Sequence, residues 1–140
     1  MKILDEINKK RLEFGAQPVK LDEKLNELAQ KHSDEMAEND FSGHESLTGK
    51  NATERAKEMG LKTIVGENVG VDSSIELVIK NLERSPAHLQ NTINLNWENV
   101  GIGISLGKNG AYYITQDFST RDIEADPLSK EEIEQHKDEI

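Results

Sequence analysis

The sequence predicts a single α+β domain in which helices enclose a small, mostly antiparallel sheet. A chain of 140 residues is long enough for one hydrophobic core but short for two. Several segments repeat apolar residues at the three-to-four-residue spacing of an amphipathic helix. Residues 100–106 instead alternate with the two-residue period of a strand, and a tight-turn signal follows them. No internal repeat and no Gly-Ser linker divides the chain.

Two helices are predicted in the first third of the chain. Helical spacing runs through residues 4–14 and stops at Gly15. Asp22 is a suitable N-cap for the second helix, whose apolar stripe covers residues 25–36. His32 lies inside that stripe. We interpret it as a buried histidine with one or two hydrogen bonds, with direct ligation as the alternative.

A loop and a short helix are predicted next. Residues 41–50 contain two glycines and several hydroxyl side chains, so they form a loop, and this loop carries His44. Asn51 and Glu54 have the spacing of a capping box for a helix over residues 52–59. Arg55, in the middle of that helix, is either solvated or paired with an acid, or it orients a carboxylate near a functional site.

Residues 63–69 predict a short strand that ends in a turn at Gly66-Glu67-Asn68. Ser73 and Glu76 then predict a second capping box and a helix that ends near residue 84. Ser85 and Pro86 are typical of the N-cap and first residue of a further helix, with His88 in its first turn. The positive end of the helix dipole disfavours imidazolium, so we expect His88 to be neutral.

A hairpin is predicted from residues 100–106 and 111–118 around the turn Lys108-Asn109-Gly110. One face of its first strand carries only Gly101, Gly103 and Ser105, which allows close packing against another element. Trp97, just before the hairpin, is expected to pack in the core or at a hinge, with a surface position as the alternative.

Charge and composition exclude several classes of function. Residues 122–140 hold eight acidic and two basic residues, a net charge of −6, which leaves −4 of the total of −10 for residues 1–121. We therefore predict a domain over residues 1–121 and an acidic tail over residues 122–140. Without a basic stripe, neither nucleic acid nor an anionic membrane surface is expected as a partner. There is no cysteine, no transmembrane segment and no signal-peptide apolar region.

Three motifs carry the chemistry. His44 ends Phe-Ser-Gly-His, Glu67 lies in Gly-Glu-Asn-Val, and His88 lies in the segment 85–91, Ser-Pro-Ala-His-Leu-Gln-Asn. Two imidazoles and a carboxylate that converge from separate segments can bind a divalent metal or transfer a proton at neutral pH. Alternatively, the two histidines only tie the loop to the helix by hydrogen bonds.

The order of these motifs resembles the CAP superfamily, which comprises the cysteine-rich secretory, antigen 5 and pathogenesis-related proteins, in its cysteine-free bacterial form. The resemblance covers residues 3–119. It implies a three-layer α-β-α sandwich with a central cleft lined by His44, Glu67, His88 and Asn91. In many eukaryotic relatives a second glutamate follows an aromatic residue. Here Leu82 occupies the position of the aromatic residue, and Ser85 occupies that of the second glutamate. Glu76 and Glu83 are the nearby acids, but neither lies at the matching position of the motif.

The favoured function is a binding domain, expected to be a monomer that takes a small ligand or peptide. The resemblance implies that it is secreted or exposed on the cell envelope. A divalent cation such as zinc would be held by His44 and His88, with Glu67 as a possible third ligand. The first alternative is a metal-dependent hydrolase of the peptidase kind with Glu67 as general base. Against it, Ser42 and Ser85 are better explained as loop and cap residues than as nucleophiles. The second alternative, lipid or sterol binding, follows from the resemblance alone.

Overall fold

The computed structural model describes residues 2–120, so the predicted acidic tail, residues 122–140, lies outside the described residues. The helices are α1 (Ile3–Glu13), α2 (Glu23–Asn39), α3 (Ala52–Glu58), α4 (Ile75–Arg84) and α5 (Pro86–Thr92), and the strands are β1 (Lys20–Leu21), β2 (Val65–Asp72), β3 (Asn99–Leu106) and β4 (Tyr112–Ser119). Within residues 2–120, no helix has both the length and the apolar character needed to cross a bilayer.

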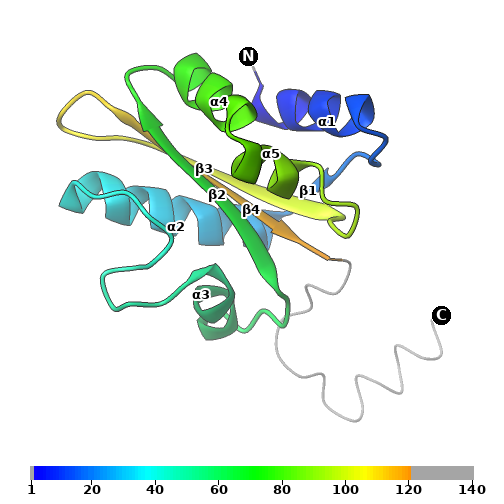
Figure 1. Ribbon diagram of the computed structural model, residues 1–140. Coiled ribbons are helices and arrows are strands. Elements are labelled where there is room, and N and C mark those ends of the chain that lie inside the picture. Colours follow the sequence, from blue (N-terminus) through cyan, green and yellow to red (C-terminus); the bar gives the residue numbers. More distant parts are fainter. Residues whose placement is uncertain (1, 121–140) are drawn as a thin grey trace, which may run out of the picture.

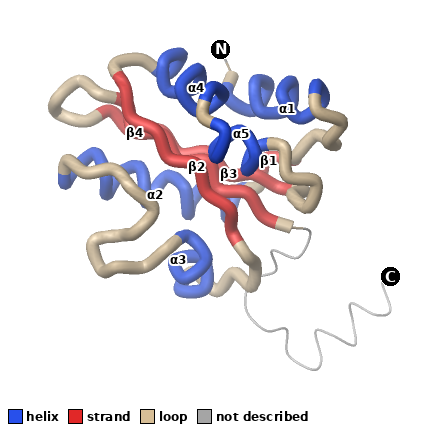
Figure 2. Tube along the Cα trace, in the orientation of Figure 1, coloured by secondary structure: helices blue, strands red, loops and turns tan. Residues whose placement is uncertain are grey.

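The elements form the three-layer sandwich that the sequence predicted. The sheet has the strand order β1-β3-β4-β2; β1 is parallel to β3, and the other two pairings are antiparallel. Helices α2 and α3 cover one face of the sheet, and α1, α4 and α5 cover the other (Figure 1). The same division is visible when helices and strands are coloured by type (Figure 2). Because β2 is an edge strand, groups from both helical layers can meet beside it.

The predicted helix starts are confirmed at α2 and α3 and shifted at α4. Asp22 Oδ1 accepts a hydrogen bond from Leu25 N (2.9 Å), and Asn51 and Glu54 form the reciprocal capping box. The N-cap of α4 is Ser74, not Ser73, and its hydroxyl accepts from the backbone N–H of Leu77. The hydroxyl of Ser73 instead donates to the side chain of Asp72. Ser85 occupies the N-cap position of α5 without a side-chain capping bond.

The predicted turn at residues 66–68 is wrong, because these residues lie within β2. They pair in register with Phe118, Asp117 and Gln116 of β4. Glycine is needed at position 66 for packing and not for a turn, since a side chain there would overlap the indole of Trp97. Glu67 is therefore held by a paired strand.

Helix α2 packs closely against the face of β3 that carries Gly101 and Gly103, as the sequence predicted. A Cβ at Gly101 or Gly103 would overlap the backbone of α2 at Leu25 or Ala29, so the two glycines set the close approach of helix and strand. Two amide side chains of α2 also cover the free edge of β3. Asn26 Oδ1 accepts from Ile102 N (2.9 Å), while Gln30 both accepts from Ile104 N (3.0 Å) and donates to Ile104 O (2.8 Å). This edge is thus closed to strand addition.

Each helical layer has its own hydrophobic core. On the side of α1, α4 and α5, Trp97 is buried and stacks on Phe118 with ring centroids 6.3 Å apart, which confirms its expected core position. The buried residues of this core are Ile3, Ile7, Val19, Val78, Ile79, Leu82, Trp97, Val100, Ile114 and Phe118. Those of the other side are Leu25, Leu28, Ala52, Ala56, Leu61 and Val65.

Arg11 joins α1 to the end of α5 and has a role that the sequence did not reveal. Its side chain is fully buried and donates only to backbone carbonyls. The acceptors are the carbonyls of Gln17, Thr92, Asn94 and Trp97, at 2.6–3.2 Å. Burial lowers the pKa of the guanidinium from its ordinary value. A cation at a helix C-terminus is favourable, so Arg11 fixes the helix that carries His88.

Candidate functional site

The site is built around the carboxylate of Glu67, whose side chain is only 3% exposed. Its Oε1 accepts from Nδ1 of His44 (3.1 Å) and from Nη2 of Arg55 (3.0 Å). Its Oε2 accepts from the same Arg55 nitrogen (2.9 Å). Arg55 is therefore paired with an acid and not solvated, and because that acid is Glu67, the contact also matches the alternative interpretation, an arginine that orients a carboxylate near the predicted site.

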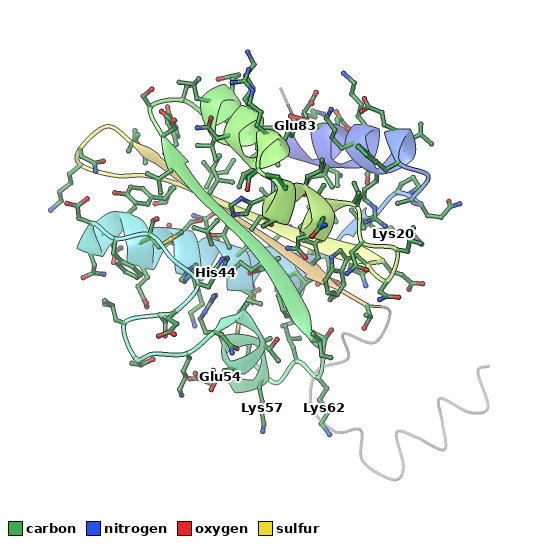
Figure 3. The ribbon with its side chains drawn as sticks, viewed as in Figure 1. Lys20, His44, Glu54, Lys57, Lys62 and Glu83 are labelled. Carbon is green, nitrogen blue, oxygen red and sulfur yellow. The ribbon has the colours of Figure 1, made fainter. Side chains whose placement is uncertain are left out.

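The loop that carries His44 is held at several points of its backbone. Nε2 of His32 donates to the carbonyl of Gly43 (2.6 Å), and Arg55 donates to the carbonyl of His44 (2.8 Å). The backbone N–H of Leu47 donates to Glu35 on α2 (2.6 Å). His32 is thus the buried, hydrogen-bonded histidine that the sequence predicted. His44 lies between α2 and β2 in Figure 3, with its ring more than half exposed.

Charges and burial act in opposite directions on these groups. Burial alone would raise the pKa of Glu67, but the hydrogen bond from His44, the neighbouring carboxyl group of Asp117 and the charge of Arg55 outweigh it and lower the pKa. The hydrogen bond to Glu67 raises the pKa of His44. Burial lowers the pKa of His32, which is therefore neutral near pH 7 and donates its Nε2 proton in a hydrogen bond to the carbonyl of Gly43.

His88 approaches β2 from the opposite helical layer. Its carbonyl accepts from the hydroxyl of Thr92 (2.9 Å) and the amide of Asn68 (3.3 Å), which anchor α5 to the sheet. The pKa of His88 is lowered, as predicted, but the causes are burial and the nearby His44. Its Nδ1 is buried with no hydrogen-bond partner among residues 2–120, so the nitrogen left for an outside partner is Nε2.

Asn91, the fourth predicted cleft residue, is engaged elsewhere. Its amide donates to Asn68 Oδ1 (3.1 Å), and its carbonyl accepts from the indole of Trp97 (2.8 Å). Asn68 also donates to Thr92 and to Gln116, so this network is buried between α5 and the sheet. Asn91 thus packs the helix of His88 and does not join the carboxylate of Glu67.

Asp117 is a member of the site that the sequence reading missed. It is fully buried on β4, directly opposite Glu67 in the register of the two strands. The one signal in the sequence is a single acid within a predicted strand, residues 111–118, whose other residues are all uncharged. That signal does not reveal which residue the acid faces.

Within residues 2–120, no set of three or more histidine, aspartate or glutamate side chains is grouped so as to hold a metal ion. Both oxygens of Glu67 already accept hydrogen bonds, which disfavours it as a third ligand. The geometry leaves the Nε2 atoms of His44 and His88 as the available donors.

The sequence profile of the CAP family, the cysteine-rich secretory proteins, matches residues 4–118. The chain belongs to the CAP family. A bacterial relative, the uncharacterized protein YkwD of Bacillus subtilis (strain 168), is 28% identical over 104 residues, which are 73% of this chain and 40% of YkwD. The chain thus spans about two fifths of that relative.

Several solved structures share the fold. An outer surface protein of Borrelia burgdorferi superposes with a TM-score of 0.76 at 18% identity, covering 85% of this chain and 90% of that one. An extracellular protein of Bacillus anthracis with an SCP domain gives a TM-score of 0.74 at 23% identity, covering 85% of this chain and 39% of that one. The CAP domain of enterococcal PrgA gives 0.59 at 19% identity, with coverages of 93% and 68%.

Proposed function

We propose that this chain is an extracellular binding domain in which His44 and His88 hold a divalent metal ion, with Zn²⁺ the best match to imidazole donors. The observation that carries the proposal is the hydrogen bond from His44 Nδ1 to Glu67. A carboxylate on one ring nitrogen fixes the tautomer, so the other nitrogen offers its lone pair to a metal, as in carboxylate–histidine–zinc arrangements.

His88 supports the same role by a different route. Burial and the neighbouring His44 lower its pKa, so its ring is neutral near pH 7. A neutral imidazole is the form that binds a metal. The pKa of His44 is raised, so metal binding there has to displace a proton, and the affinity is expected to fall as the pH is lowered.

Two protein ligands leave further coordination positions for water or for a donor atom of a bound molecule. A metal held in this way would polarise an oxygen atom of that molecule. Glu67 acts in the proposal as the outer carboxylate that orients His44, because Arg55 and His44 already occupy its oxygens. The bound molecule is therefore expected to complete the metal site.

The geometry favours binding over hydrolysis. A general base needs a pKa near the working pH and a free oxygen facing the water that it activates. The pKa of Glu67 is lowered, and its oxygens accept from Arg55 and His44. Glu67 is thus a poor base in this arrangement.

Calorimetric titration of chelator-treated protein with zinc at pH 7 tests the proposal. Wild type should show one saturable site, and His44→Ala and His88→Ala should each abolish it. Glu67→Gln should weaken binding by about 10–100-fold, the usual effect of losing an outer-shell partner. The matched control is His136→Ala, at a histidine that the proposal does not use, which should bind as wild type does. Equal binding by wild type, His44→Ala and His88→Ala would contradict the proposal.

The extracellular assignment rests on the relatives. The Borrelia burgdorferi protein is described as an outer surface protein, and the Bacillus anthracis protein is described as extracellular. Surface-protease treatment of intact cells of the source organism, followed by detection of this chain, tests the assignment. Degradation without lysis supports it, and full protection contradicts it.

A second candidate function, binding of an apolar ligand, is favoured by one observation. A groove of about 730 Å³ lies at the sheet edge opposite β2. Its apolar lining residues are Ile3, Leu4, Leu21, Ile75, Ile102 and Ile104. Displacement of a fluorescent fatty acid tests this function: Ile104→Glu should abolish binding, whereas His44→Ala should leave it unchanged. Equal binding by wild type and Ile104→Glu would remove this candidate.

A further inference from the structure

Asp117 is a buried acid that the proposed function does not use. Its side chain leaves β4 toward α2: Thr115, two residues earlier on the same face, hydrogen-bonds Ser33 of α2 (2.8 Å). On β3 its register partner is Gly101, whose open face lies against the backbone of α2. On β2 its register partner is Glu67. Asp117 is thus enclosed by three strands and a helix.

No N–H or hydroxyl group among residues 2–120 donates to either oxygen of Asp117. The titratable or charged groups that face the pair are His32 from α2, His44 from the 41–50 loop and Arg55 from α3. The hydrogen bonds of all three go to Glu67 or to the loop backbone, and β3 contributes only a glycine. Nη1 of Arg55 is buried without a partner, but it does not donate to Asp117 either. A negative charge on Asp117 would therefore be buried without a donor, beside a second carboxylate.

A buried carboxylate without donors costs far more than a buried neutral acid, and two adjacent carboxylates rarely both ionise. Asp117 and Glu67 are register partners on neighbouring strands, so their carboxyl groups leave the same face of the sheet side by side. Glu67 is the better acceptor of the two, since Arg55 and His44 stabilise its charge.

We propose that Asp117 is a neutral carboxylic acid that donates its proton to Glu67, and that it serves as a positioning residue beneath the His–Glu site. Glu67 then accepts from three sides, from Arg55, His44 and Asp117, and this holds its carboxylate where it can orient His44. The proposal concerns the same site as the proposed function, but it requires no bound metal.

The direction of the pKa of Asp117 agrees with this geometry. Burial and the charge of Glu67 raise it well above its ordinary value, whereas Arg55 opposes the shift. The pKa of Glu67 moves the opposite way. The two carboxyl groups are therefore best regarded as a pair that holds one proton near pH 7.

Carbon-13 NMR of metal-free, full-length protein tests the protonation directly. The side-chain carboxyl resonance of Asp117, assigned by its disappearance in Asp117→Asn, should lie at the position of a protonated acid throughout pH 6–8. A resonance at the carboxylate position at pH 7 would overturn the proposal. This result is independent of zinc binding, so failure of the metal site leaves it intact.

The positioning role is tested by rescue. Asp117→Asn keeps a neutral donor, whereas Asp117→Leu has a similar shape and no donor. The NMR signals of the Arg55 guanidinium report on its pairing with Glu67. They should be resolved in wild type and Asp117→Asn and averaged in Asp117→Leu. Equal changes in both variants would refute the role. If Asp117→Leu does not fold, the carboxyl resonance of the wild type and the Arg55 signals of Asp117→Asn still test the proposal.

Discussion

At the scale of single residues, the site depends on one carboxylate that serves several donors. Glu67 orients His44, pairs with Arg55 and faces Asp117. The raised pKa of His44 means that the folded state holds the proton more tightly than the unfolded chain does. The resulting stabilisation is complete below about pH 6.5, the usual value for histidine, and is lost as the pH rises through the folded pKa.

Glu67→Gln should return the pKa of His44 toward about 6.5, because a neutral amide stabilises the protonated imidazole less than a carboxylate does. An NMR titration of the His44 ring protons measures this shift. Glu45→Gln is the control, since it removes an exposed acid next to His44 in sequence. An unchanged pKa in Glu67→Gln would contradict the hydrogen bond.

Arg55→Met should destabilise the fold by about 3 kcal/mol, because it leaves Glu67 buried without its cation. Urea unfolding at pH 7 measures the loss. Lys57→Met, at an exposed position of the same helix, should change the free energy of unfolding by less than about 0.5 kcal/mol. Similar losses in the two variants would show that the pair contributes little.

At the scale of elements, local sequence rules predicted the helices well, and they failed where a distant residue decides. The capping box at Asn51 and the hairpin turn at Gly110 involve neighbours in sequence. Gly66 was predicted to be a turn glycine because local sequence shows only its neighbours. In the structure a glycine is needed there because the ring of Trp97, which is distant in sequence, leaves no room for a side chain. Arg11 likewise bonds Thr92, 81 residues away.

Ser74→Ala should cost about 1 kcal/mol, the usual loss for an N-cap hydroxyl, because Leu77 N–H loses its acceptor. Ser73→Ala, one residue earlier, removes only an exposed bond to Asp72 and should cost less than about 0.5 kcal/mol. Thermal or urea unfolding of the two variants measures the difference. A larger loss for Ser73→Ala would restore the capping box read from the sequence.

Gly101→Ala should destabilise the protein by about 3 kcal/mol, because the added methyl group meets the backbone of α2, which cannot move aside as a flexible side chain can. Ser105→Ala, on the same face near the end of β3, is the matched control and should be nearly neutral. Equal unfolding midpoints for wild type and Gly101→Ala would mean that the helix and strand are not in close contact.

At the scale of the whole molecule, the sheet separates two surfaces of different chemistry. The site of His44, Glu67 and His88 lies along the β2 edge, where the 41–50 loop on one side of the sheet and α5 on the other each contribute a histidine. The apolar groove lies along the opposite edge. The motifs in the sequence were sufficient to predict the sandwich and to bring His44 close to Glu67. Asp117 could not be assigned to the site from sequence, since its partner is set only by the register of β2 against β4.

Anomalous diffraction from crystals of the zinc-loaded protein tests the central claim most directly. The account predicts one strong zinc peak at about 2.0–2.1 Å from Nε2 of both His44 and His88. Glu67 should remain hydrogen-bonded to Nδ1 of His44 in the same crystals. A zinc peak on Glu67, a peak on only one histidine, or no peak at the β2 edge would contradict the account.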